Sequence, residues 1–125
     1  MSNTYRCDDN QPENIKSAVT ASQTVQGTDI ELFGAMGLSA HVVCTNGAAG
    51  TLYIDGTNQW TNPQRGNTVN WQSGVVSQAL SANQTAFFQY SMVDAITQFA
   101  RVRVRFVSSA AGNVQVSTNV RRVTY

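Results

Sequence analysis

The chain has 125 residues and a net charge of +1, with 46 Ser, Thr, Asn and Gln residues against 15 charged ones. This length fits one domain that buries about two-thirds of its unfolded surface without cross-links. A charge near zero gives no steering towards nucleic acid or membranes. No apolar run is long enough for a membrane span or a signal peptide, so we expect synthesis in a cytoplasm. The excess of neutral polar residues is typical of β-rich chains, because Thr favours strands and Asn and Ser favour turns.

Residues 1–16 contain Pro12 and no apolar period, which predicts an extended N-terminal arm ahead of a single domain at 17–125. A polar segment of this kind cannot order itself by burial. It would be held by its own domain, by a neighbouring copy or by another protein, and an arm that orders on a neighbour can produce tight assembly. Lys16 is the one lysine, so few flexible charges protect the sheet edges, which also favours assembly.

From Ser17 onward, short runs alternate apolar and polar residues, which is the pattern of half-buried strands. Segment 57–66 indicates a loop, and segment 93–98 a single helical turn or a bulged link. About eight strands at spacings of about 8–12 residues predict an antiparallel β-sandwich or jelly roll. The predicted strands are 19–25, 30–32, 38–44, 52–54, 69–80, 84–92, 99–107 and 114–119.

The clearest alternation runs through residues 99–107, where apolar residues share one face of the strand and three arginines share the other. Turn residues follow at 108–113, and a second alternating run occupies 114–119. We therefore predict a terminal hairpin with one buried and one wet face. This hairpin would bring Arg121 beside Arg101.

The two cysteines, Cys7 and Cys44, fit no metal spacing. Cys44 has the inward parity of its strand, which predicts a buried free thiol. The alternative is a disulfide that ties the arm to the sheet through Cys7, formed by oxidation after release from the cell.

Residues 37–47 (GLSAHVVCTNG), residues 50–58 (GTLYIDGTN) and Trp71 resemble small β-sandwich proteins of tailed-bacteriophage particles. Residues 99–120 are similar to the usual ending of those chains, an aromatic-x-R-V-R-V strand, a glycine-containing turn and a Val-rich strand. The resemblance implies a virion structural role: capsid decoration (cement), a head or tail accessory subunit, or a fibre module. This chain departs from the pattern after Asn58, where a longer loop containing Trp60 replaces the usual Asp-Gly turn.

The arginine row Arg101, Arg103 and Arg105 would place guanidinium groups about 6.6–7 Å apart along one strand face. Such a row suits contact with an acidic partner surface by bidentate pairing to carboxylates. The alternative is a solvated face whose side-chain stems cover neighbouring apolar atoms. Binding to DNA is not expected, because interleaved stacking aromatics are lacking.

Trp60, Trp71 and the outward-facing Tyr53 could form a platform for sugar rings, since aromatic faces pack on sugar C–H groups and amides pair with hydroxyls. The alternative for Trp71 is packing in the core. For Trp60, which lies in the predicted loop, the alternatives are contact with a subunit or partner and local packing.

No catalytic arrangement can be built from these residues, so we expect no enzyme and no cofactor. His41 is the one histidine, it has an outward strand position, and no acid is identifiable that would orient it. The aspartates lack calcium-loop spacing, and Asp55-Gly56 predicts a turn.

We therefore expect a virion structural protein, made in the host cytoplasm, that decorates a capsid by binding the major capsid protein or other virion subunits through its arm and one sheet face. Symmetry-related copies, such as a trimer, would add their contacts. The alternative is a carbohydrate- or receptor-binding module of a phage tail or capsid surface. The residues expected to contact the partner are Tyr5, Arg6, Asp8, Asp9, Trp60, Arg101, Arg103 and Arg105.

Overall fold

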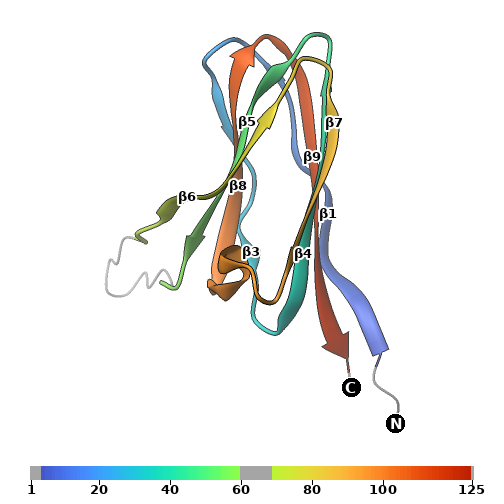
Figure 1. The fold of residues 1–125 in the computed structure, drawn as a ribbon, viewed down its shortest axis with the longest axis vertical. Coiled ribbons are helices and arrows are strands. Elements are labelled where there is room, and N and C mark those ends of the chain that lie inside the picture. Colours follow the sequence, from blue (N-terminus) through green and yellow to red (C-terminus); the bar gives the residue numbers. More distant parts are fainter. Residues whose placement is uncertain (1–3, 60–68, 125) are drawn as a thin grey trace.

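The computed structural model, which describes residues 4–59 and 69–124, is a sandwich of two antiparallel sheets (Figure 1). Its elements are β1 (Thr4–Val19), β2 (Thr24–Gln26), β3 (Ile30–Glu31), β4 (Ala35–Thr45), β5 (Ala49–Thr57), β6 (Gln72–Leu80), β7 (Thr85–Ser91), the 3-10 helix η1 (Ala95–Gln98), β8 (Arg101–Ala110) and β9 (Gly112–Thr124). The first sheet has the order β1-β9-β4-β7. The second has the order β2-β8-β5-β6, and β3 also pairs with β8. No helix in the described part of the chain is long and apolar enough to cross a membrane.

The core lies between the sheets and is built from the alternating apolar residues that the sequence predicts. Val104 and Phe106 of β8 and Ile54 of the neighbouring β5 are fully buried. The first sheet contributes Val42 and Val116 to the same cluster. Complete burial of an aliphatic or aromatic side chain of this size contributes about 1.5–3 kcal/mol. The predicted all-β antiparallel sandwich is confirmed.

The predicted terminal hairpin is wrong, because β8 and β9 belong to opposite sheets. β8 pairs with β5, β2 and β3, whereas β9 pairs with β4 and β1 (Figure 1). The chain crosses between the sheets at Gly112, where a Cβ atom would lie 2.4 Å from the backbone nitrogen of Ala48. Arg101 and Arg121 therefore lie in different sheets and are not neighbours across a hairpin. The alternation shows that each strand has one buried face. It does not show whether two successive strands pair with each other in one sheet or belong to opposite sheets.

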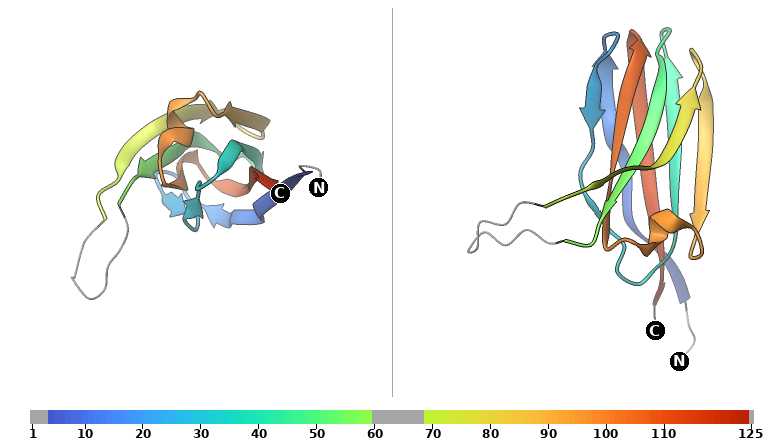
Figure 2. Two further views of the ribbon diagram at one scale, coloured as in Figure 1. Left: turned by 90° about the horizontal axis from the view of Figure 1, so that it is seen from below. Right: turned by 60° about the vertical axis from the view of Figure 1, so that its left-hand side comes forward.

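The segment predicted as an arm is strand β1, the edge strand of the first sheet, and it pairs along its length with β9. Ile15 and Val19 enter the core. Asn14 Nδ2 donates to Thr118 Oγ1 at 3.0 Å, and Asn14 Oδ1 accepts from the Thr28 backbone nitrogen at 2.9 Å. The sequence allowed this segment to be held by its own domain, by a neighbouring copy or by another protein. In the structure, it is held by the chain's own sandwich. The two ends of the chain lie side by side (Figure 2), because Thr4 pairs with Thr124.

Most other predicted elements are confirmed with changed boundaries. The predicted strand 19–25 is divided by a turn in which Ser22 has a positive φ of 62° and the Thr20 backbone nitrogen donates to Gln23 Oε1 at 2.9 Å. The helical turn predicted at 93–98 is η1. Most of the loop predicted at 57–66 lies outside the described residues.

Cys44 is a buried free thiol, as its parity predicts. Burial raises the pKa of Cys44 above its usual value, because the thiolate loses its solvation there. Cys44 therefore forms no disulfide in the structure, in contrast to the alternative prediction.

Candidate functional site

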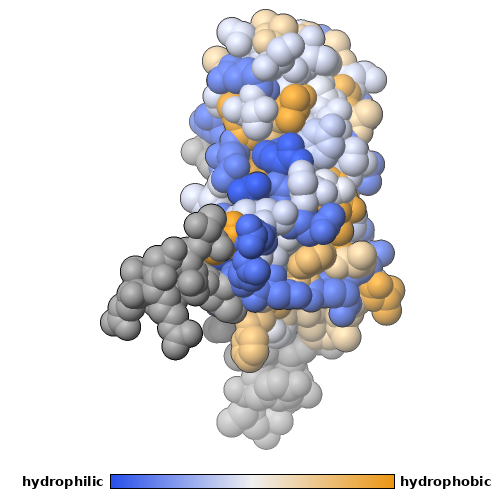
Figure 3. Space-filling view, turned by 90° about the vertical axis from the view of Figure 1, so that its left-hand side faces the viewer, coloured by the Kyte–Doolittle hydropathy of each residue, from blue (hydrophilic) through white to orange (hydrophobic). Residues whose placement is uncertain are grey.

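The residues with the densest polar contacts lie on the outer surface of the second sheet, over β5 and β8. The register of these strands sets Tyr53 opposite Arg105, Asp55 opposite Arg103, and Thr57 opposite Arg101. Figure 3 shows strongly hydrophilic residues gathered across this side of the molecule. We call this surface the arginine face, and its residues are Tyr53, Asp55, Trp71, Arg101, Arg103 and Arg105.

Asp55 is the centre of the arginine face, although it has no exposed surface. Its Oδ2 accepts hydrogen bonds from Arg103 Nε at 2.9 Å and Arg105 Nε at 2.7 Å, and its Oδ1 accepts from the Gly74 backbone nitrogen at 2.7 Å. Burial alone would raise the pKa of Asp55, but the hydrogen bonds from Arg105, Gly74 and Arg103 lower it below its usual value. Asp55 lies inside β5, so the turn predicted at Asp55-Gly56 is wrong.

Two aromatic rings of the arginine face are covered by guanidinium groups. The Arg103 guanidinium carbon lies 4.5 Å from the centre of the Trp71 ring, and that of Arg105 lies 4.4 Å from the centre of the Tyr53 ring. These are cation–π distances. Trp71 is partly exposed and stacks on this outer face, so the alternative of core packing is wrong for it. The ring faces that a sugar would need are taken by arginines, which does not favour a sugar platform here.

The arginine row is largely neutralised within the chain. Asp55 compensates one positive charge, and Arg101 forms an ion pair of 3.4 Å with Asp29. Arg101 also donates to the Gln59 carbonyl oxygen at 3.0 Å. All three arginines of the row are therefore engaged by groups of the chain itself. The contacts around Asp55 link β5, β6 and β8 to one another.

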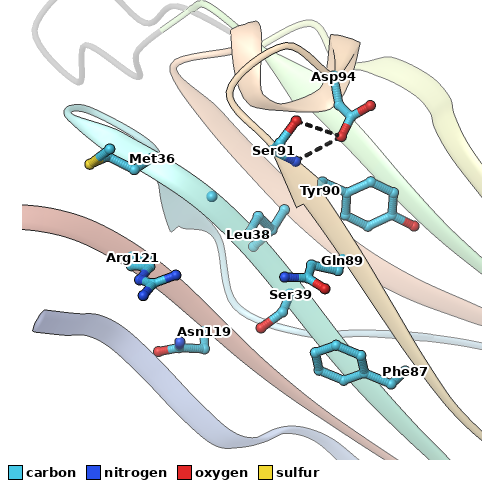
Figure 4. Close-up of a pocket in the computed structure, with 11 residues that line it drawn as sticks. Met36, Leu38, Ser39, Phe87, Gln89, Tyr90, Ser91, Asp94, Asn119 and Arg121 are labelled. Atoms are coloured by element: carbon cyan, nitrogen blue, oxygen red, sulfur yellow. Dashed lines mark hydrogen bonds between the residues drawn. The ribbon is translucent and has the colours of Figure 1, made fainter. Parts of the chain in front are cut away.

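A groove lies on the outer surface of the first sheet, above β4 (Figure 4). Its volume is about 640 Å³. Side chains of β7 and β9 form its two sides, and the small residues Gly37 and Ser39 of β4 form its floor. We call it the β4 groove, and the lining residues that matter below are Ser39, Phe87, Gln89, Asn119 and Arg121.

No single segment of the sequence indicates the β4 groove, because its residues come from three separate segments. They become neighbours only through the strand order β9-β4-β7. The signal that existed was a set of polar outward positions on each strand. His41, predicted to be outward and exposed, borders the groove, and its ring meets the Phe87 ring edge-on at 6.3 Å.

A third feature is the end of the sandwich where both termini lie, which we call the termini end. Gly37 pairs with Ser91, so the loop before β4 and the loop after β7 extend from the same end (Figure 1). These loops carry Phe33, Met92 and Val93, which are 83%, 52% and 88% exposed.

The structure does not bring all the expected partner-binding residues together. In the β1–β9 register, Tyr5, Arg6 and Asp8 lie opposite Val123, Arg122 and Val120, and Asp9 falls in a register shift. These positions belong to the first sheet at the termini end, whereas the arginine row lies on the second sheet. Trp60 is outside the described residues. Within residues 4–59 and 69–124, no group of three metal-binding side chains lies together.

No protein-family model matches the chain, and no curated protein matches it in sequence. Solved structures match it in shape. A protein of Bacillus endospore appendages, which are described as disulfide-linked pili, has a TM-score of 0.52 at 13% identity over 99% of this chain and 88% of that one. The SPBc2 prophage-derived protein YomS has a TM-score of 0.53 at 11% identity over 96% of this chain and 93% of that one.

The K3 cleaved adhesin domain of Lys-gingipain from Porphyromonas gingivalis has a TM-score of 0.50 at 8% identity, over 86% of this chain and 70% of that one. At identities of 8–13% these likenesses show the fold alone. The chain is a β-sandwich with a fold that occurs in pilus, prophage-derived and adhesin proteins.

Proposed function

We propose that the protein is a virion structural subunit, a capsid decoration protein that binds the shell through its termini end. The observation that carries this proposal is the distribution of exposed apolar side chains. Among the described residues, four large apolar side chains are exposed, and Phe33, Met92 and Val93 share the termini end. Single exposed apolar residues are ordinary, but a group at one end marks a protein contact.

Strand β1 would extend this contact. It is an edge strand of 16 residues, and an edge strand offers backbone groups to which another chain can add a strand. Its first half carries Tyr5, Arg6, Asp8 and Asp9, to which we assign polar shell contacts around the apolar centre. We also assign secondary contacts with the partner to Trp60 and to the arginine row. The row would act through the positive charge that Asp55 and Asp29 do not compensate. Assembly as a symmetric oligomer such as a trimer would multiply each contact.

Co-sedimentation with mature capsids of the encoding phage tests this proposal. Full-length protein is expected to pellet with the capsids. A form lacking residues 1–13, and the double variant Phe33→Ser with Val93→Ser, are expected to bind at least about tenfold more weakly. The truncation stops at residue 13 because Asn14 and Ile15 hold β1 in the fold.

Phe87→Ser is the matched control, since Phe87 is exposed but lies away from the termini end on β7. It is expected to bind like the unaltered protein. Failure of the unaltered protein to pellet, or equal binding by all three variants, would contradict the proposal. Light scattering of the same proteins gives the number of copies per oligomer in solution. This measurement distinguishes a loss of self-association from a loss of shell contact.

A further inference from the structure

We propose that the β4 groove binds a neutral oligosaccharide. This site lies on the outer surface of the first sheet, apart from the termini end to which the shell contact is assigned, so it does not depend on that function. The register places Gln89 and Asn119 on either side of Ser39, in one row across the groove. In Figure 4 the same side chains lie above β7, β4 and β9.

This row has hydrogen-bonding capacity that the protein itself does not use. In the described part of the chain, the side chains of Ser39, Gln89 and Asn119 make no hydrogen bond, and Asn119 Oδ1 is buried without a partner. A buried polar atom left unsatisfied costs about 1–3 kcal/mol. Rotation of the Asn119 amide could present either its oxygen or its nitrogen to the groove. Sugar hydroxyls both donate and accept, so they match two amides and a hydroxyl better than a purely accepting anion does.

The next row supplies an aromatic surface. Phe87 lies opposite His41, and His41 lies opposite Ser117. The Phe87 side chain is 61% exposed, and the His41 ring supports it edge-on at 71° rather than covering its face. This contrasts with the arginine face, where guanidinium groups lie over Trp71 and Tyr53. A sugar ring can therefore pack its C–H groups on Phe87 while its hydroxyls meet the amide row.

The charges around the groove favour a neutral ligand. The row of Gln89, Ser39 and Asn119 has no ionisable side chain, while Arg121 and Asp94 bring opposite charges to the groove's margins. Asp94 Oδ2 accepts from the Ser91 backbone nitrogen at 2.7 Å. The width of the groove from β7 to β9 is two strand spacings, about 9.6 Å, which admits one extended oligosaccharide chain along β4. Its volume of about 640 Å³ falls within the range of ligand sites, about 300–1,000 Å³.

The experiment is a titration of the ¹⁵N-labelled full-length protein with cellohexaose, maltohexaose, the neutral hexa-N-acetylchitohexaose and, as the anionic comparison, hexagalacturonate. At least one neutral hexasaccharide at millimolar concentration is expected to shift the side-chain amide signals of Gln89 and Asn119. Phe87→Ala and Gln89→Leu are each expected to weaken that binding at least about tenfold. Phe33→Ala is the matched control, because Phe33 is also an exposed phenylalanine but lies outside the groove.

Several outcomes would overturn the inference. These are no shift with any neutral hexasaccharide, unchanged binding by Phe87→Ala and Gln89→Leu, tighter binding of hexagalacturonate, or shifts confined to Tyr53 and Trp71. Phe87 and Gln89 are exposed, so both variants are expected to fold, which their ¹⁵N spectra verify. Capsid co-sedimentation is a separate measurement. A negative sugar titration therefore does not contradict the decoration function, and a negative co-sedimentation result does not contradict sugar binding.

Discussion

Replacement of Asp55 by alanine is expected to lower the free energy of unfolding by about 3 kcal/mol. The carboxylate has no exposed surface and accepts hydrogen bonds from Arg103, Arg105 and the Gly74 backbone nitrogen. Its removal leaves two guanidinium groups, with side chains 24% and 19% exposed, without their shared partner. Partial access of these arginines to water keeps the loss at the lower end of the range for broken buried ion pairs, about 3–5 kcal/mol.

Urea unfolding monitored by circular dichroism measures this loss, and thermal unfolding should show a midpoint about 10 °C lower. Asp29→Ala is the matched control, since Asp29 is an exposed aspartate that pairs with Arg101 at 3.4 Å. Its loss is expected to stay below about 1 kcal/mol. Equal losses for the two variants would show that the Asp55 cluster does not order the second sheet.

The same carboxylate predicts how stability depends on pH. Its pKa is lower in the folded protein than in the unfolded chain, so its contribution is complete above the unfolded value of about 3.9 and is lost as the pH falls through the folded value. The free energy of unfolding should therefore fall less steeply below about pH 4 in Asp55→Asn than in the unaltered protein. Parallel pH profiles for the two proteins would contradict this assignment.

Phe106→Ala is expected to cost about 4 kcal/mol, the largest single effect at any position considered. Phe106 is fully buried between the sheets and is the largest fully buried side chain among the residues whose burial the structure describes. Neighbouring strands on both sides of β8 fix the backbone, so the walls of the cavity cannot move in to fill it. The loss is read from urea unfolding at 25 °C.

Phe33→Ala makes the same chemical change at a side chain that is 83% exposed. Its effect is expected to stay within about 0.5 kcal/mol of the unaltered protein. If Phe106→Ala cost no more than Phe33→Ala, the packing between the sheets would not be the source of stability.

Alternation of apolar and polar residues was sufficient to predict the fold class, because burial of one strand face imposes a period of two on the sequence. It also placed Val104 and Phe106 in the core and His41 on the outside. It could not assign β8 and β9 to a sheet, because partner choice depends on residues far away in the sequence.

The candidate sites were less predictable for the same reason. The Asp55-Gly56 pair predicts a turn because Asp-Gly is a common turn dipeptide, whereas the ion pairs of Asp55 come from the cross-strand register of β5 with β8. The β4 groove combines residues of β4, β7 and β9, and no segment alone carries its chemistry. For residues 1–16 the sequence predicts an extended arm but not which partner holds it, because backbone pairing, such as that of β1 with β9, leaves no apolar period in the sequence.

The position of the last two strands has a consequence for biosynthesis. Within residues 4–59 and 69–124, β1 pairs with β9 alone, and β2 and β3 pair with β8 alone, so these three strands have no sheet partner until β8 and β9 have been made. β9 then lies inside the first sheet, between β1 and β4, and β8 lies inside the second sheet, between β2 and β5. The sandwich can therefore close only once β8 and β9 have been made, through slow pairing of segments that are distant in the sequence. A chain cut short before β8 would lack an inner strand of each sheet, which would leave β1, β2 and β3 without their sheet partners.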